Sequence, residues 1–462
     1  MIAPSLLGDA ELVEFLSGQD WFDPRGRGVL YARVIEAPVV RDEPPQLAIA
    51  IVEVVFEGGV QQLYQLPLGL TPPGGEPRWG IVARHDGWTA YDAVVDPVLV
   101  GELVQHMRTG MTLEGDGAVL ELHAERDLGG SDVARVDLRT TNRKTTLLLD
   151  EQLVLKVYRR LEAGINPELE LLRFLSDRGF SNIGTLAGWY GVAGRPIEAT
   201  LGVLRRFIAA EGDGWTLALR ALADVPERFL ASVTRLGEVI GSMHIALASD
   251  TSDPTFAPEA PSAEAHALLA ATVDEEIAQL FASIKDEEAL APIVWRGEEV
   301  RERLRLLAQQ PGMGRVIRTH GDLHLGEVVW SGEDWYVVDF EEVPGRPLAE
   351  RRRKQSPLRD VASMLRSFAF AVSASSLLRG VEAPPDWEGR ARAGFLSGYF
   401  SVVEPTGLIP GGRGASEKLL AIFELERALL ELRYELDHRP EWAPIPATAI
   451  ERLLDEPLTL TP

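Results

Sequence analysis

The sequence predicts an α+β fold of two lobes, because β-rich segments come first and helical segments come last in the 462-residue chain. After Trp215 the pattern becomes mainly helical, apart from the stretch 316–340, and the segment before Gln105 forms an extra unit. We therefore expect an extra N-terminal β-rich subdomain at 1–105, an intermediate β-rich, nucleotide-binding subdomain at 106–206 and a helical lobe at 207–462.

Strand signals dominate the first part. Val29–Val40 and Leu47–Phe56 are rich in β-branched residues, and Glu57-Gly58-Gly59 turns the chain into Val60–Leu68, which predicts a hairpin. The apolar spacing of Asp96–Met111 predicts a helix.

The second part continues with strands between residues 117 and 159. A helix is expected at Pro167–Arg178 and a further strand at Ile197–Ile208.

Composition excludes several classes of protein. No cysteine is present, which excludes disulfides and cysteine-type zinc sites and fits a cytoplasmic location. The net charge of −24 makes nucleic acid and anionic membranes unlikely partners, because like charges repel. No signal peptide or transmembrane helix is expected from the apolar runs.

The strongest motif is His320–Glu327, followed by the apolar strand that ends at Asp339-Phe340-Glu341. Phosphoryl transfer to an alcohol needs a carboxylate that orients the hydroxyl and accepts its proton, and Asp322 fits that role. It also needs ligands for Mg²⁺ on the phosphates of ATP, which Glu327 and Asp339 can supply. The order and spacing parallel the catalytic elements of protein kinases, so we expect a kinase-like, ATP- and magnesium-dependent site.

The nucleotide-binding residues are predicted from weaker signals. Lys156 lies at the centre of an apolar strand, from which it can reach the α- and β-phosphates. Glu170 is expected to hold Lys156 by an ion pair, with Glu168 as the competing candidate. Thr145 belongs to the segment where a phosphate-covering loop is expected, and Phe207 with Ile208 fits a hinge that meets adenine.

At these residues the chain resembles the actinobacterial maltokinase family, over nearly its whole length. The N-terminal motifs are Trp21-Phe22 with Arg25-Gly26-Arg27, and Tyr64-Gln65-Leu66-Pro67-Leu68. The later motifs are His320–Glu327, Pro344–Arg352, Ser356–Ser367 and Arg439–Trp442.

The resemblance implies a bilobal, protein-kinase-like fold of the aminoglycoside-phosphotransferase type with an extra N-terminal cap. It also implies phosphorylation of maltose by ATP to maltose 1-phosphate for α-glucan synthesis, with trehalose synthase as a partner. Glu327 departs from the family's usual Gln, Leu430 from its Tyr and Arg427 from its Lys.

The resemblance also places the helix at 423–438 beside the acceptor. Arg427, Glu431 and Tyr434 recur on one face of that helix, and we expect them to bind the sugar. His324 is expected near the reacting hydroxyl, with Trp442 as a further acceptor contact. Without the resemblance this polar face would be interpreted as solvated.

Other interpretations stay open at this point. A related branch phosphorylates glucosamine, and aminoglycosides are a further class of acceptor. A pseudokinase or regulatory scaffold is a third possibility, against which the intact Lys156, Asp322 and Asp339 argue. His244 lies in an amphipathic helix and is interpreted as structural.

Overall fold

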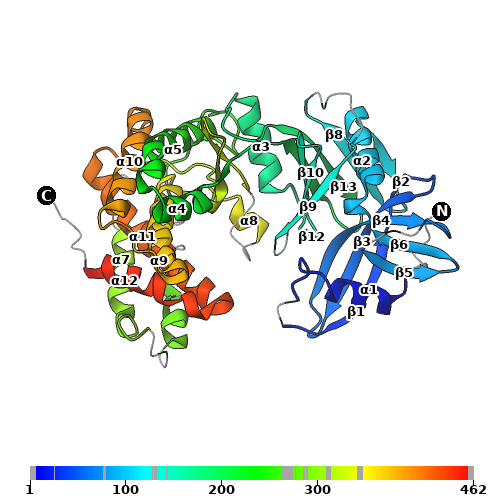
Figure 1. Ribbon diagram of the computed structural model, residues 1–462, viewed down its shortest axis with the longest axis horizontal. Helices are drawn as coiled ribbons and strands as arrows, with labels where there is room; N and C mark the ends of the chain where they lie inside the picture. Colours follow the sequence, from blue (N-terminus) through cyan, green and yellow to red (C-terminus); the bar gives the residue numbers. More distant parts are fainter. Residues whose placement is uncertain are drawn as a thin grey trace. The chain divides into compact units, whose positions relative to one another are not determined.

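The computed structural model contains two compact units, which Figure 1 shows as ribbons. It describes residues 7–455 except 25, 76, 78–79, 127, 129–132, 142–143, 263–273, 276, 285–286, 288–289, 309–313 and 341–346. The first unit comprises residues 1–176 and 184–209, and the second comprises residues 177–183 and 210–462. The expected division of the first unit at residues 105 and 106 stays a prediction.

A seven-stranded antiparallel sheet forms the N-terminal part of the first unit, and we call it the first sheet. Its elements are α1 (Asp9–Ser17), β1 (Val29–Glu36), β2 (Val39–Arg41), β3 (Gln46–Phe56), β4 (Gln61–Thr71), β5 (Ile81–His85), β6 (Trp88–Asp92) and the later strand β12 (Arg160–Leu161). The expected hairpin is β3–β4, where Gly58 and Gly59 have φ values of +83° and +79°, a conformation that residues with a Cβ rarely adopt.

A second seven-stranded sheet has the strand order β7-β8-β13-β14-β11-β10-β9. Its strands are β7 (Thr112–Glu114), β8 (Ala118–Ala124), β9 (Val136–Thr141), β10 (Lys144–Leu149), β11 (Leu153–Val157), β13 (Leu186–Gly194) and β14 (Ala199–Arg206). Besides α1, the helical elements of the first unit are η2 (Ala93–Val95), α2 (Pro97–Thr109) and α3 (Pro167–Asp177). The strand β11, which carries Lys156, lies between β10 and β14, so its backbone is hydrogen-bonded on both edges.

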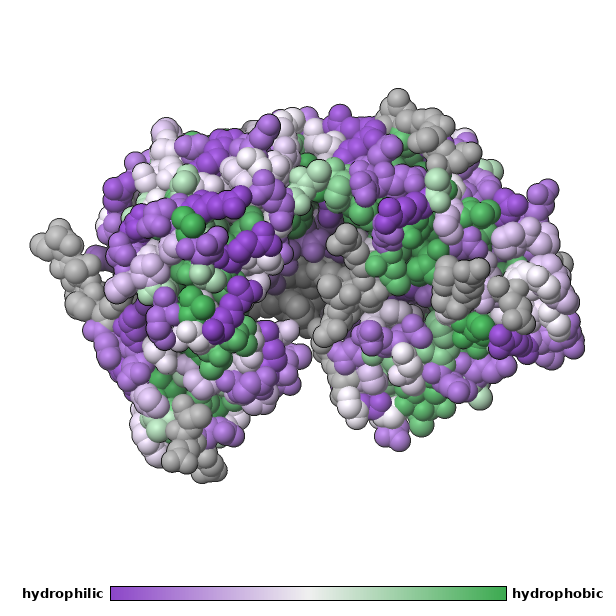
Figure 2. All heavy atoms as spheres, viewed as in Figure 1, coloured by the Kyte–Doolittle hydropathy of each residue, from purple (hydrophilic) through white to green (hydrophobic). Residues whose placement is uncertain are grey.

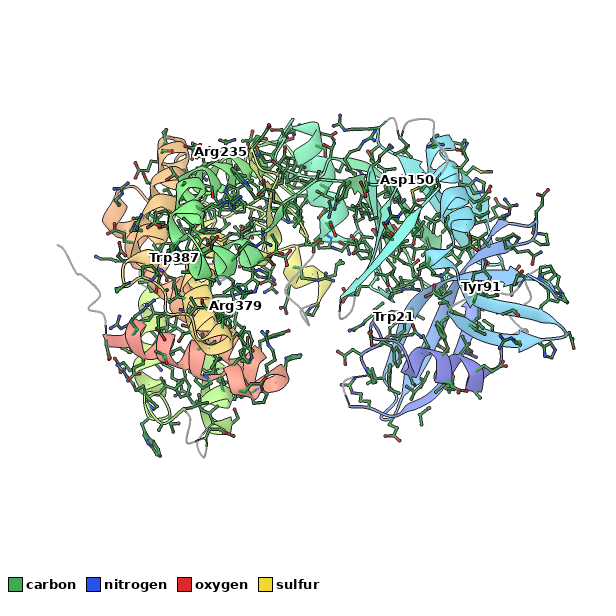
Figure 3. The ribbon with its side chains drawn as sticks, viewed as in Figure 1. Trp21, Tyr91, Asp150, Arg235, Arg379 and Trp387 are labelled. Atoms are coloured by element: carbon green, nitrogen blue, oxygen red, sulfur yellow. The ribbon has the colours of Figure 1, made fainter. Side chains whose placement is uncertain are left out.

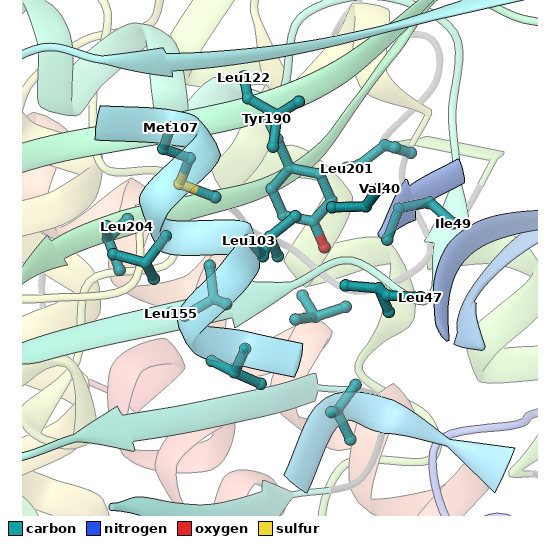
Figure 4. Close-up of a cluster of buried hydrophobic side chains, with 14 of the residues drawn as sticks. Val40, Leu47, Ile49, Leu103, Met107, Leu122, Leu155, Tyr190, Leu201 and Leu204 are labelled. Carbon is teal, nitrogen blue, oxygen red and sulfur yellow. The ribbon is translucent and has the colours of Figure 1, made fainter. Parts of the chain in front are cut away.

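Helix α2 covers the core that joins the two sheets (Figure 4). The Asp96 carboxylate caps this helix by accepting hydrogen bonds from the Val98 and Leu99 N–H groups. Leu103 and Met107 of α2 lie in one buried cluster with Leu47 of the first sheet. Since each fully buried side chain of this kind contributes about 1.5–3 kcal/mol, the shared cluster helps to hold the two sheets together.

The second unit is mainly helical. Its helices are α4 (Gly214–Ala223), α5 (Pro226–Leu247), α7 (Gly297–Ala308), α8 (Leu348–Arg351), α9 (Leu358–Arg379), α10 (Trp387–Val403), α11 (Arg413–His438) and α12 (Pro444–Asp455), with the short turns η4 (Leu325–Glu327), η5 (Glu404–Thr406) and η6 (Pro440–Trp442). A small antiparallel sheet joins β15 (Gly212–Asp213), β16 (Val328–Trp330) and β17 (Trp335–Val337). On the face drawn in Figure 2, both units show mainly hydrophilic side chains.

Among the described helices, α9 is the one that is long and apolar enough to cross a membrane. However, 67% of its most apolar stretch is buried inside the protein. It also carries the buried charged residues Asp360 and Arg366, both of which are hydrogen-bonded to other elements of the second unit. These features are typical of a core helix.

Helices α5 and α10 pack through glycines. A Cβ at Gly398 of α10 would lie 1.9 Å from the Thr234 carbonyl oxygen, and one at Gly237 of α5 would lie 2.0 Å from the Phe395 carbonyl oxygen. No real Cβ approaches an oxygen so closely, so both residues must lack a side chain for the helices to cross at this separation.

We therefore expect Gly398→Ala to lower the free energy of unfolding by about 1–3 kcal/mol, as overpacked cores do. Gly389→Ala is the matched control, because a Cβ there meets nothing within 4 Å and alanine favours a helix. Urea unfolding of both variants measures the difference. Equal stabilities would show that α5 and α10 can separate at little cost.

Candidate active site

The loop that begins at His320 is held by the buried carboxylate of Asp360. One Asp360 oxygen accepts the His320 N–H at 2.8 Å, and the other accepts the Gly321 N–H at 3.0 Å. Asp360 lies in the first turn of α9 and is almost fully buried. The loop conformation therefore depends on a residue 40 positions later in the chain.

His244 of α5 completes this support. Its Nε2 donates to Asp360 at 3.0 Å, and its Nδ1 lies 3.0 Å from the Tyr399 hydroxyl of α10. Burial opposes ionisation of Asp360, but the contacts with His244, His320 and the Gly321 N–H outweigh it, so its pKa lies below the ordinary value. The structural role expected for His244 is therefore to orient the Asp360 carboxylate, which holds the loop.

Asp322, the predicted base, is paired with Arg427 of α11. Arg427 Nη1 donates to Asp322 Oδ1 at 2.6 Å. Burial of Asp322 opposes its ionisation, yet the charge of Arg427, with smaller contributions from His324 and His320, lowers its pKa. The carboxylate is therefore charged at neutral pH and 17% of its side chain stays exposed.

Alternating charges continue from this pair into α9. Arg427 Nε lies 3.6 Å from Glu431 Oε1, and Arg366 Nη2 donates to Glu431 Oε2 at 2.7 Å. The side chain of Arg366 is only 1% exposed. The structure thus brings two predicted acceptor residues to the predicted base, and we call Asp322, Arg427, Glu431 and Arg366 the charged row.

The two predicted metal ligands lie at the same end of the β16–β17 hairpin. Val328 pairs with Val337 in this hairpin, and the Val338 N–H donates to the Glu327 carbonyl at 3.0 Å. Asp339 is the next residue and has a φ of +58°, which is uncommon for a residue with a side chain and recurs at functional sites. Two carboxylates at one hairpin end are suitable oxygen ligands for Mg²⁺.

His320 connects the loop to this hairpin. Its Nε2 donates to the Val338 carbonyl at 2.9 Å, and its ring lies 4.9 Å from that of Phe340. His324 caps the turn η4 by accepting the Gly326 N–H at 3.0 Å, and its Nε2 lies 3.6 Å from Glu327. Within the described ranges no group of three or more His, Asp or Glu side chains could hold a metal. Glu341, the third residue of the predicted motif, lies outside the described residues.

Lys156 is paired with Glu168, which corrects the first choice of Glu170. Lys156 Nζ lies 2.8 Å from Glu168 Oε2, and both residues are buried. Asn166 accepts the Glu168 N–H through its side chain, so α3 begins with Glu168 in its first turn, facing the strand. Glu170 is only half-buried.

Thr145 has a structural role, which also corrects a prediction. Its hydroxyl is buried and accepts the Arg159 Nε–H at 2.9 Å. The segment predicted to cover phosphates is the β9–β10 hairpin, whose residues 142 and 143 lie outside the described ranges.

The hinge candidates Phe207 and Ile208 follow β14, and the Phe207 N–H already donates to the Gln152 carbonyl at 2.8 Å. Adenine therefore cannot rely on that donor.

Tyr434 and Trp442 belong to a row of rings beyond the charged row. Tyr434 stacks on His438 with a centroid separation of 4.3 Å, and 44% of it is exposed. The Arg439 guanidinium lies over both Tyr434 and Trp442, and Trp442 stacks on Phe370 of α9. Sequence analysis missed Phe370, although it lies four residues after Arg366 and hence on the same face of α9.

Comparison with known proteins finds two family models and several relatives that match this chain. Residues 123–393 match the family model of the phosphotransferase enzyme family, and residues 15–96 match the maltokinase N-terminal cap domain. A glucosamine kinase of Mycolicibacterium smegmatis is 30% identical over 67% of this chain and 77% of its own length. A glucosamine kinase of Streptacidiphilus jiangxiensis is 25% identical over 63% of this chain and 66% of its own length.

Solved structures agree on the fold. A glucosamine kinase in complex with glucosamine, ADP and inorganic phosphate superimposes with a TM-score of 0.69 at 19% identity, covering 96% of this chain and 99% of that chain. A second crystal form of a glucosamine kinase gives a TM-score of 0.71 with the same identity and coverage. The predicted fold class, a protein-kinase-like fold with an N-terminal cap, is confirmed.

Proposed function

Because this chain belongs to the phosphotransferase enzyme family, we propose that it transfers the γ-phosphoryl group of ATP to a hydroxyl group of a sugar. The observation that carries the proposal is the geometry at Asp322. An ionised carboxylate, partly exposed, is held in a loop by Asp360 and by Arg427. Such a carboxylate can orient an alcohol and accept its proton as the phosphoryl group arrives.

The other roles follow from the chemistry of the side chains. Glu327 and Asp339 would hold Mg²⁺, which supplies positive charge to the phosphates. Lys156 would contribute a fixed positive charge to a phosphate of ATP, and its ion pair with Glu168 keeps it extended from β11. Ile208 is the remaining hinge candidate for adenine.

For the acceptor we place maltose first and glucosamine second. The charged row contains two positive and two negative groups, so its net charge is zero and it favours no charge on the acceptor. This suits an uncharged sugar, whereas an ammonium group would find both carboxylates already paired. The match of residues 15–96 to the maltokinase cap also favours maltose. Glucosamine is the second candidate because the two relatives described above are glucosamine kinases.

A panel of matched acceptors tests this proposal. ADP release from MgATP is measured with maltose, glucose, glucosamine and kanamycin, so that glucose and glucosamine differ only by the amino group. We expect the highest kcat/KM with maltose and a higher value with glucose than with glucosamine. A preference for glucosamine would select the second candidate, and transfer to kanamycin alone would overturn the assignment to sugars.

Tyr434→Ala provides a test of the acceptor side that leaves the fold intact. The ring is 44% exposed, so its removal costs little stability, and we expect the KM of the acceptor to rise while the KM of ATP stays unchanged. Glu431→Ala is less informative, because it leaves the buried Arg366 without its carboxylate. If Tyr434→Ala left acceptor kinetics unchanged, the end of α11 would have only a structural role and would not bind the acceptor.

Two expectations from the sequence stay predictions. One is a cytoplasmic location, which the absence of cysteine favours. The other is a partnership with trehalose synthase, which co-purification of the two proteins would test.

A further inference from the structure

The buried amide of Gln65 joins the first sheet to the strand that carries Lys156. Gln65 lies on β4 and is fully buried. Its Nε2 donates to the Tyr158 carbonyl at 2.8 Å and to the Leu201 carbonyl, and its Oε1 accepts the Tyr190 hydroxyl at 3.0 Å. Both amide donors and the amide oxygen are therefore engaged with residues outside the first sheet.

Tyr158 carries this connection onward to Lys156. The Tyr158 hydroxyl donates to Glu168 Oε2 at 2.9 Å, and Lys156 Nζ lies 2.8 Å from the same oxygen. Lys156 lies on β11 and Tyr158 directly follows this strand, and both side chains reach the same carboxylate oxygen. A shift of the Tyr158 backbone would thus move the carboxylate that orients the lysine.

A second connection fixes the neighbouring residue. Arg159 is buried, and its guanidinium forms a two-pronged ion pair with Asp92 at the end of β6, with a shorter separation of 2.6 Å. The same guanidinium lies 4.6 Å from the Trp21 ring, which is labelled in Figure 3. The backbone N–H of Gln65 also donates to the backbone carbonyl of Arg159 at 2.8 Å. The segment after β11 is consequently tied to the first sheet at two successive residues.

Six of the seven strands of the first sheet, β1 to β6, lie within the residues that match the cap domain, and the same match includes Trp21, Gln65 and Asp92. We propose that the cap contributes to nucleotide binding. In this proposal Gln65 is a positioning residue for Lys156 and acts through Tyr158 and Glu168. Gln65 touches no substrate in this account. The inference uses the proposed role of Lys156 at the phosphates of ATP, but not the identity of the acceptor.

Gln65→Met tests the proposal, because it keeps the length of the side chain and removes the amide. We expect the dissociation constant of MgADP, measured by calorimetry, and the KM of ATP to rise about tenfold, roughly the effect of one lost buried hydrogen bond. The KM of the acceptor should not change. Gln61→Met is the matched control, since Gln61 lies exposed on the same strand.

Two hydroxyl deletions keep the test decisive if Gln65→Met does not fold. Tyr190→Phe releases the oxygen of the Gln65 amide, and Tyr158→Phe removes the donor to Glu168. Each should weaken MgADP binding in the same direction while the ring packing is kept. Wild-type affinity for MgADP in folded Gln65→Met, or in both phenylalanine variants, would overturn the proposal. Because MgADP binding needs no acceptor, the MgADP affinities of these variants can be interpreted even if the sugar assignment is wrong.

Discussion

Asp322→Asn is expected to lower kcat by about 10²–10⁴, the usual contribution of a positioned general base. The amide keeps the shape of the carboxylate but cannot accept the proton of the attacking hydroxyl. Asp360 and His244 hold the loop backbone independently of the Asp322 side chain, so the loop should keep its conformation. Initial rates at saturating ATP and acceptor measure the effect.

The control for this variant is Asp437→Asn, which makes the same chemical change at an exposed position of α11. It should leave kcat unchanged. Circular dichroism and the Tm of Asp322→Asn show whether the fold is kept. A folded Asp322→Asn protein with near-wild-type turnover would remove this residue from the mechanism.

Arg427→Gln is expected to move the acid limb of the pH profile of kcat/KM to higher pH. Burial raises the pKa of Asp322, and in the wild-type protein Arg427 more than offsets this effect. The lowered pKa keeps the base ionised, and active, until the pH falls below the ordinary aspartate value of about 3.9. Without the guanidinium the effect of burial dominates, so Asp322 takes up a proton at a higher pH and activity is lost earlier on acidification.

The same sign applies to stability. Since the pKa of Asp322 is lower in the folded state than in the unfolded state, its ion pair stabilises the wild-type protein above about pH 4 and is lost on further acidification. Arg433→Gln, on the same helix, is the matched control for Arg427→Gln and should leave the pH profile of kcat/KM unchanged. An unchanged acid limb in Arg427→Gln would mean that Asp322 is not the group that titrates.

The candidate catalytic residues were the part of the site for which the sequence carried the most direct signal. His320–Glu327 and Asp339 lie within 20 residues of one another, so their order and spacing are visible in the chain itself. Strand and helix signals were similarly local, and the hairpin at Gly58 and Gly59 and the helix α2 are found where they were expected.

Interactions between distant segments could not be predicted in this way. The face of α11 that carries Arg427 and Glu431 was visible from helical periodicity, but its contact with Asp322 joins residues 105 positions apart. His244 and Asp360 are separated by 116 positions, so an amphipathic helix gave no sign of their contact.

The choice between Glu168 and Glu170 depended on packing. Both lie in the first turn of α3, and only the covered face of the helix decides which one meets Lys156. Thr145 was misassigned for a similar reason, since the partner of its hydroxyl, Arg159, lies beyond the next strand, β11. Gln65 was visible only as part of a motif shared with the maltokinase family, because its partners come from three other strands or their ends.

The measurement that tests the central claim most directly is identification of the product formed from maltose and MgATP by the purified protein. Phosphorus NMR should show a phosphate ester bonded to C1, and the product should no longer reduce Cu²⁺, because phosphorylation at C1 blocks the reducing end. A reducing product would place the phosphate on another hydroxyl. Release of inorganic phosphate without any sugar phosphate would contradict the proposed transfer itself.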